Sequence, residues 1–310
     1  MMTQLTAMEV SNASLYDGAT ALAEAVLMAV RANTKKTGKK ILCMGAIHPY
    51  YHQTVANIVS HQGIVLSTHP TDPETGQFLA DFSEIDWSDV VAVIIPQPNF
   101  LGVIEEVDAI TRLAHQNQSF VIAVVNPTVL TLVTPPGEWG DTGADIAVGE
   151  GQPLGVPLAS GGPYFGFMTT RKSLVRHMPG RIVGKTTDAN GLEGFTLTLQ
   201  AREQHIRRSK ATSNICTNQG LAVTAATIYM SLMGPYGLKQ TALRCYQQCH
   251  ILLSALTTLG IAPVFNAPTF HEALVALPIC AQHFCERMLK EYKIIAGLTL
   301  TQFPSVTLNI

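Results

Sequence analysis

The chain has 310 residues, of which 47% are hydrophobic and 14% charged, and its formal net charge at pH 7 is −2. This length can bury a large core, as one large domain or as a large and a small one, and the composition excludes a disordered chain. The small net charge provides no basic field for nucleic acid, and no apolar run reaches the ~18–20 residues of a membrane span. The N-terminus lacks a charged segment followed by an apolar one, so we expect a soluble, cytoplasmic protein.

Strand and helix patterns alternate through the first part of the chain. A short helix is expected at residues 1–8, and Asp17 is a good N-cap for the amphipathic pattern that follows it. Apolar strands, alternating with helical patterns, are expected at 40–44, 64–66, 90–95 and 120–125. The run at 90–95 is apolar throughout, which is typical of a parallel strand covered on both faces. This alternation predicts a doubly wound, mostly parallel α/β sheet with right-handed crossovers.

The second part of the chain is dominated by helical patterns. A helix starting at Gln219 is expected to end at Met233-Gly234-Pro235, and a long helix then runs to a stop at Gly260. An apolar segment at 273–277, a short helix and a last strand at 306–310 follow. We therefore predict a large α/β domain over residues 1–232, and a linking helix with a smaller α+β domain over residues 233–310.

The six cysteines do not form a metal-binding pattern. Cys245 and Cys249 lie one helical turn apart with His250 beside them, but no second ligand pair with zinc spacing accompanies them. Buried cysteines of a helix explain this arrangement better, and no metal site is predicted.

The stretch 202–219 is the most distinctive part of the sequence. It places four cations and one carboxylate within nine residues, and a run of small polar side chains follows: Thr212, Ser213, Asn214 and Thr217. Backbone amides ahead of a helix are free to meet an anion, and hydroxyl and amide groups can support the same contact. From chemistry alone, an ordinary capped loop with a solvated basic face explains these residues equally well.

The residues of this stretch resemble the signature of the glycine-cleavage P-protein, the pyridoxal-phosphate-dependent glycine decarboxylase. The resemblance is to its first (alpha) subunit, or to the N-terminal half where both halves are fused, and it covers nearly all of the 310 residues. It implies pyridoxal-phosphate-dependent transferase fold type I with a smaller α+β C-terminal domain. Family members continue beyond both ends of this sequence, so the chain is expected to be truncated at both.

Within this resemblance, two positions argue against a complete cofactor site on this chain. Asn126 closes its strand where enzymes of this fold place the Asp that keeps the pyridinium nitrogen protonated. In the segment that ends in Gly161-Gly162-Pro163, Gln152 falls on the position of the cofactor-binding lysine of the partner subunit. A glutamine amide cannot form a Schiff base. Pyridoxal phosphate is therefore expected to be bound by the partner subunit and not covalently by this chain, and no catalytic residue is predicted here.

The resemblance also implies partners and an activity. The whole enzyme would decarboxylate glycine and pass the aminomethyl group to the lipoyl arm of H-protein, as a heterotetramer with a lysine-bearing second subunit. Of the distinctive stretch, Thr212, Ser213, Asn214 and Thr217 are expected to face the partner's cofactor. Three cations are expected at the interface or to dock an acidic carrier: Arg207, Arg208 and Lys210.

Three alternatives remain open at this level. The Gly-x-x-x-Gly-Lys-Thr sequence ending at Thr186 suggests a phosphate loop, but that motif requires four residues between its glycines and this sequence has three. We expect an interface or active-site loop at 180–186 instead. A stand-alone pyridoxal-phosphate enzyme, such as an aminotransferase or a cysteine desulfurase, is disfavoured by Gln152 and Asn126. A non-catalytic assembly partner or a decayed fragment is not excluded by the sequence.

Overall fold

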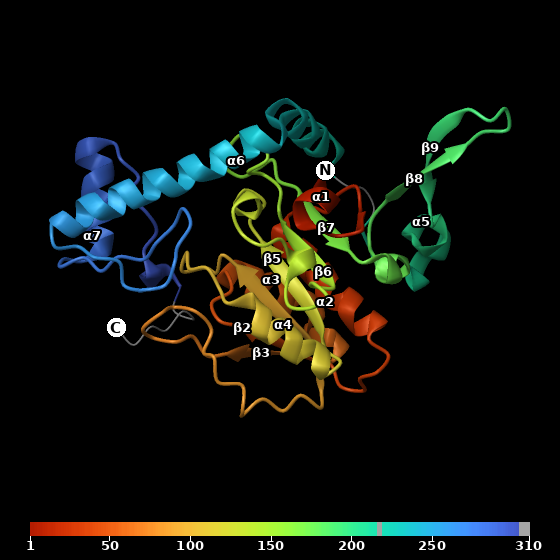
Figure 1. Ribbon diagram of the computed structural model, residues 1–310, viewed down its shortest axis with the longest axis horizontal. Helices are drawn as coiled ribbons and strands as arrows, with labels where there is room; N and C mark the ends of the chain where they lie inside the picture. The colour runs from red at the N-terminus through yellow and green to blue at the C-terminus, as the bar shows by residue number, and fades with distance from the viewer. Residues whose placement is uncertain (216–218, 304–310) are drawn as a thin grey trace.

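The computed structural model describes residues 1–215 and 219–303. Its main sheet has the strand order β1-β7-β6-β5-β4-β2-β3, with the strands β1 (Val10–Ser11), β2 (Lys40–Met44), β3 (Val65–His69), β4 (Val90–Gln97), β5 (Phe120–Val125), β6 (Ile146–Glu150) and β7 (Gly166–Thr170). Strands β2 to β6 are parallel, whereas β7 runs antiparallel to β6 and β1 antiparallel to β7. The predicted doubly wound, mostly parallel sheet is confirmed (Figure 1).

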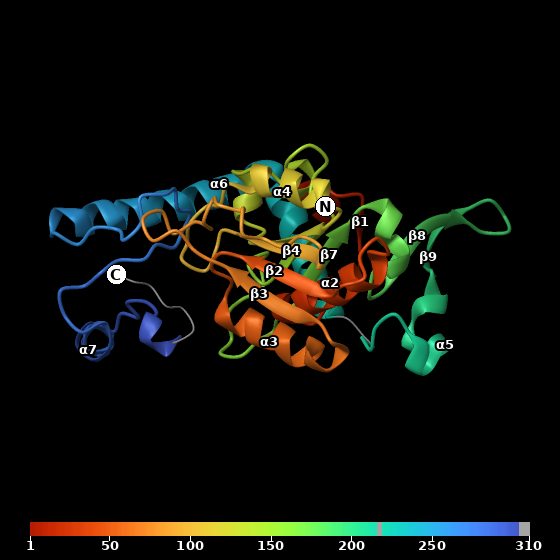
Figure 2. The same cartoon turned by 90° about the horizontal axis from the view of Figure 1, so that it is seen from below.

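Helices cover both faces of this sheet (Figure 2). Helices α2 (Gly18–Ala32) and α3 (Pro49–Val59) pack on one face, where they form one buried apolar cluster with side chains of β2, β4, β5 and β6. Helix α4 (Val107–Gln116) packs on the other face, with Trp139 fully buried beside it and α1 (Met2–Thr6) at the edge. Both faces of β4 are thus covered, which explains its continuous apolar sequence.

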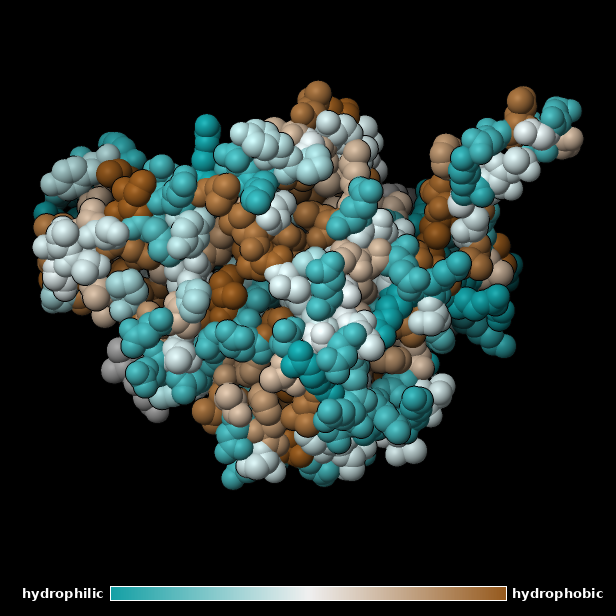
Figure 3. All heavy atoms as spheres, viewed as in Figure 1, coloured by the Kyte–Doolittle hydropathy of each residue, from teal (hydrophilic) through white to brown (hydrophobic). Residues whose placement is uncertain are grey.

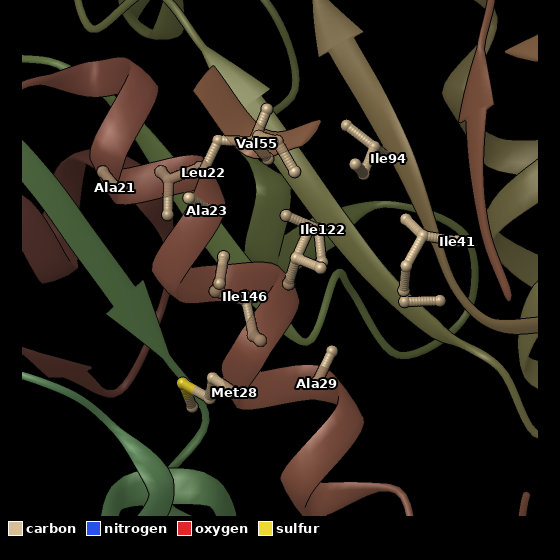
Figure 4. Close-up of a cluster of buried hydrophobic side chains, with 14 of the residues drawn as sticks. Ala21, Leu22, Ala23, Met28, Ala29, Ile41, Val55, Ile94, Ile122 and Ile146 are labelled. Atoms are coloured by element: carbon tan, nitrogen blue, oxygen red, sulfur yellow. The ribbon is translucent and has the colours of Figure 1, made fainter. Parts of the chain in front are cut away.

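Helix α2 is the best-buried helix of the described chain. Its alanines let the backbone approach the sheet closely, and Leu22 and Met28 belong to the apolar cluster between the helix and the sheet (Figure 4). Burying one such large apolar side chain contributes about 1.5–3 kcal/mol. Asp17 caps the helix as predicted: its Oδ1 accepts a hydrogen bond of 2.7 Å from the Thr20 backbone N–H, and Thr20 Oγ1 accepts one of 3.2 Å from the Asp17 N–H.

Residues 180–186 do not form the loop expected from the sequence. Residues from 182 onward belong to β8 (Ile182–Thr187), which pairs antiparallel with β9 (Glu193–Thr198) in a two-stranded hairpin that projects from the body of the molecule (Figure 1). Asp188 stabilises the turn, because its Oδ1 accepts hydrogen bonds of 2.8 Å from the Asn190 N–H and 2.9 Å from the Leu192 N–H. The Asn190-Gly191 pair was the sequence signal for this hairpin.

Helix α6 (Gly220–Thr258) links the sheet to the C-terminal part of the described chain. Its backbone is broken at Gly234, where φ is 60° and ψ is −180°, so the helix end predicted at Met233-Gly234-Pro235 is observed as a kink. By length and composition alone α6 could cross a membrane, with 17% of its apolar window buried. One such helix is weak evidence of a membrane span, because helices of soluble proteins pass the same test.

The remaining segments are short. Helical elements lie at α5 (Gln204–Arg207), α7 (Ala281–Arg287), η1 (Ser60–Gln62), η2 (Val129–Thr131), η3 (Pro136–Glu138), η4 (Lys172–His177), η5 (Gln200–Arg202), η6 (Arg208–Lys210), η7 (Met288–Tyr292) and η8 (Leu300–Gln302). The segment 273–277 is not a strand; Val275 forms an isolated bridge with Pro263. The strand expected at 306–310 lies outside the described residues, and the division into domains at residue 232 stays a prediction.

Candidate functional site

A cavity of about 610 Å³ opens at the carboxyl ends of β4, β5 and β6. The second half of α6 and the segments at 271–275 and 296–300 close it from the other side. This edge is where open α/β sheets bind ligands, because side chains at the ends of neighbouring parallel strands converge there. The cavity is therefore the candidate site of this chain.

Asn126 follows β5 and lines the cavity. Its side-chain Oδ1 accepts a hydrogen bond of 2.8 Å from the Thr128 N–H, so the amide also shapes the local turn. Its position at the end of β5 is the one expected from the sequence. A neutral amide there provides no charge to hold a proton on a bound aromatic nitrogen.

Glu150 ends β6 and places its carboxylate at the N-terminus of α2. Its Oε2 accepts a hydrogen bond of 2.9 Å from the Gly18 N–H, and its Oε1 accepts bonds of 3.0 Å from the Gln152 N–H and 3.2 Å from the Phe165 N–H. The first backbone N–H of α2 is thus already bonded to this side chain and not to an external anion.

The Asp17 carboxylate adds negative charge at this helix end. Burial raises the pKa of Glu150 despite its three hydrogen bonds, and the nearby Asp17 carboxylate raises it further. Burial also raises the pKa of Tyr51, and the charges of Glu150 and Asp17 act in the same direction. A phosphate at the start of α2 would therefore meet two carboxylates.

Gln152 does not provide an amine to the cavity. Its Nε2 donates a hydrogen bond of 3.2 Å to the Pro163 carbonyl oxygen, which holds the loop after β6. Lys185 is engaged elsewhere, in an ion pair of 2.6 Å with Glu193 on the hairpin. Among the described residues that line the cavity there is neither a lysine nor an arginine. A cofactor that needs a Schiff base and a phosphate cradle does not fit these residues.

The small polar side chains predicted to face a cofactor do not line this cavity. Ser213 donates a hydrogen bond of 2.9 Å from Oγ to Glu24 Oε1 on α2, and the Thr212 N–H donates one of 2.9 Å to the Arg202 carbonyl. Asn214 is exposed beside them, and Thr217 lies outside the described residues. The segment therefore packs along α2, away from Asn126 and Glu150.

The three cations predicted at an interface form what we call the basic cluster: Arg207, Arg208 and Lys210. All three are exposed, on α5 and η6, near the projecting hairpin (Figure 1). In the part of the chain that the structure describes, none of them forms an ion pair. Their charges are therefore available to another molecule.

Two carboxylates of structural importance were not singled out from the sequence. Glu150 stands in a Gly-Glu-Gly sequence directly after a strand, which is the signal that could have identified it. Glu105 is 3% exposed and accepts hydrogen bonds of 2.7 Å from Asn99 Nδ2 and 2.9 Å from the Phe78 N–H. Burial raises its pKa to about 7. Over the described residues, no group of three or more His, Cys, Asp or Glu side chains could hold a metal ion.

Solved structures with the same fold define the class of this protein. The chain is similar in fold to an alanine–glyoxylate aminotransferase from Nostoc sp., with a TM-score of 0.60 and 14% identity over 96% of this chain and 75% of that one. At this identity the similarity concerns the fold alone. The chain has the α/β fold of pyridoxal-phosphate-dependent transferases of fold type I, as predicted.

The chain belongs to the glycine cleavage system P-protein family, whose model matches residues 1–309. It is 39% identical to a solved glycine decarboxylase (P-protein) of the glycine cleavage system in inhibitor-bound form, with a TM-score of 0.86 over 93% of this chain and 64% of that one. The resemblance inferred from the sequence is confirmed.

Curated relatives carry the name "Probable glycine dehydrogenase (decarboxylating) subunit 1". The chain is 56% identical to that of Legionella pneumophila (strain Corby), over 93% of this chain and 64% of the relative. It is 57% identical to that of Nitrosomonas europaea, over 97% and 66%. The chain thus spans about two thirds of the length of these relatives.

Proposed function

We propose that this chain is the subunit of glycine dehydrogenase (decarboxylating) that lacks the cofactor-binding lysine. In this proposal it assists the decarboxylation of glycine and the transfer of the aminomethyl group to the lipoyl arm of H-protein. Pyridoxal phosphate is held by a second, lysine-bearing subunit. The observation that carries the proposal is the hydrogen bond that the Glu150 carboxylate accepts from the Gly18 N–H. This contact occurs in a site that has the fold of a cofactor enzyme but no lysine among its described lining residues.

The contributions of this chain to the shared enzyme are then structural and electrostatic. Thr212, Ser213, Asn214 and Thr217 approach the phosphate side of the partner's cofactor, and the bond from Ser213 to Glu24 on α2 supports this role by fixing the segment. The basic cluster lies at the interface or docks an acidic carrier. The working assembly is a cytoplasmic heterotetramer of both subunits, and this chain alone is inactive.

The test is exchange of bicarbonate with the carboxyl group of glycine. The second subunit, lipoylated H-protein and pyridoxal phosphate are assayed with and without this chain. Activity that requires both subunits supports the proposal. Full activity without this chain, or no association between the two subunits, contradicts it.

A second measurement addresses the location of the cofactor. The isolated chain is mixed with pyridoxal phosphate and treated with borohydride, which fixes a Schiff base covalently. No lysine is expected to be labelled stoichiometrically at one equivalent of pyridoxal phosphate, because the described cavity lining contains none and exposed lysines react only weakly and without selectivity. A lysine labelled to that extent on this chain would favour the stand-alone enzyme instead. The comparisons do not favour that alternative or a decayed fragment.

A further inference from the structure

The β8–β9 hairpin, together with its turn, projects from the molecule, and we call it the arm (Figures 1 and 2). Its register pairs Val183 with Leu197 and Lys185 with Phe195. Because side chains of a strand alternate between its faces, Val183, Phe195 and Leu197 share one face. Phe195 is 79% exposed, Val183 54% and Leu197 38%. The space-filling view shows apolar side chains along this arm (Figure 3).

The two faces of the arm differ in chemistry. The face opposite Phe195 carries small residues, because the register pairs Gly184 with Thr196 and Thr186 with Gly194. The apolar side chains are thus gathered on one side instead of being scattered. An isolated two-stranded hairpin is marginally stable in water, and an aromatic side chain on such a face gains most from burial in a partner's pocket. The arm has the composition of a binding element.

Charged groups border this apolar face. The ion pair of Lys185 with Glu193 lies next to Phe195, and the basic cluster lies near the base of the arm. A complementary surface therefore has an apolar pocket for an aromatic ring and carboxylates at its rim. A second copy of this chain fits poorly, since a two-fold symmetric contact places the same patch on both sides and brings the two basic clusters together.

We propose that the arm docks this chain onto the lysine-bearing subunit, with Phe195 inserted into an apolar pocket whose rim is acidic. The inference rests on the proposed function, because that function supplies the partner. Phe195 is the anchor of the contact, and the basic cluster guides its approach. The arm's opposite face stays in contact with solvent.

The test compares variants on the two faces of the arm. Phe195→Asp removes the ring and adds a charge, Phe195→Thr removes the ring while keeping a residue that favours strands, and Thr196→Asp adds the same charge on the opposite, exposed face. The dissociation constant for the second subunit is measured by titration calorimetry. Both Phe195 variants should bind at least about 30-fold more weakly, as expected for a buried aromatic anchor, and Thr196→Asp within about threefold of wild type.

Folding is checked separately. Phe195 is largely exposed in this chain, so thermal unfolding of the isolated variants should match wild type. Unchanged affinity of both Phe195 variants overturns the proposal. So does an effect confined to self-association of this chain or to binding of H-protein, because the occupant is then a second copy or the carrier.

Activity of the wild-type pair separates this inference from the proposed function. If the wild-type pair exchanges bicarbonate and the Phe195 variants bind normally, the function stands and the arm has no docking role. If wild-type subunits do not associate, both proposals are rejected.

Discussion

Glu150 and Asn126 lie at the ends of neighbouring strands, and both remove features that a cofactor phosphate and ring would need. Glu150 supplies a covalently attached anion to the Gly18 N–H, so α2 keeps a favourable negative charge at its N-terminus without a ligand. Asn126 supplies a neutral amide that hydrogen-bonds the Thr128 N–H. At this scale the chain has the geometry of the fold, while both side chains accept hydrogen bonds from its own backbone.

Replacing Glu150 tests this internal bonding. Glu150→Ala leaves the N–H groups of Gly18, Gln152 and Phe165 without their acceptor. The free energy of unfolding should fall by about 1–3 kcal/mol, the cost of leaving buried donors unsatisfied. Denaturant titration measures this free energy of unfolding. Glu84→Ala is the matched control, because Glu84 is exposed, and its effect should stay within about 0.5 kcal/mol. Equal effects of the two changes would show that Glu150 does not hold the helix end.

Glu105 makes stability depend on pH. Its folded pKa of about 7 lies above the ordinary 4.5, so between these values the folded state holds a proton that the unfolded state has released. The stabilisation is fully present below about pH 4.5 and is lost as pH rises through about 7, by up to about 3 kcal/mol. Unfolding free energies from pH 5 to 8.5 should therefore decline less steeply in Glu105→Gln than in wild type. Parallel slopes would assign the pH dependence to other groups.

Element boundaries follow the strength of the local sequence signal. The apolar strands and the Asp17 cap were predictable because burial on both faces and capping each leave a local pattern. The arm was missed because only β9 alternates apolar with small residues, at Phe195 and Leu197, whereas β8 shows no such alternation. The bond from Glu150 to Gly18 joins residues 132 positions apart, and no local pattern reports such a contact.

The kink of α6 depends on a single residue. Gly234 has φ 60° and ψ −180°, a region that only glycine adopts without strain, and no atom lies within 4 Å of where a Cβ would be. Gly234→Ala should thus destabilise the fold by about 1–3 kcal/mol through the backbone alone. Gly220→Ala, in ordinary helical backbone, should be neutral or slightly stabilising. The midpoint of denaturant unfolding measures the change in stability of both variants. A neutral Gly234→Ala would show that α6 can straighten in solution.

For the whole molecule, charge is the property that links this chain to others. The formal net charge is only −2, yet the basic cluster is concentrated beside the arm and has no ion pair within the described residues. Such an arrangement accelerates association with an acidic surface without making the protein basic as a whole. The composition alone excluded a basic field, the sequence located the basic cluster, and the folded chain places that cluster beside the arm.

Changing the basic cluster to alanine should slow association with the second subunit about tenfold or more at low ionic strength, with a smaller effect on dissociation. The difference from wild type should shrink as salt is raised from about 0.05 M to 0.5 M, because the Debye length then falls well below the distances over which the charges act. Stopped-flow mixing measures both rates.

The matched control changes three lysines after α2 to alanine, with the same loss of charge: Lys35, Lys36 and Lys39. It should leave association nearly unchanged, because these lysines belong to the connection between α2 and β2 and not to the arm or the basic cluster. If both triple variants slow association equally, the overall charge of the chain, and not the position of the basic cluster, determines the encounter.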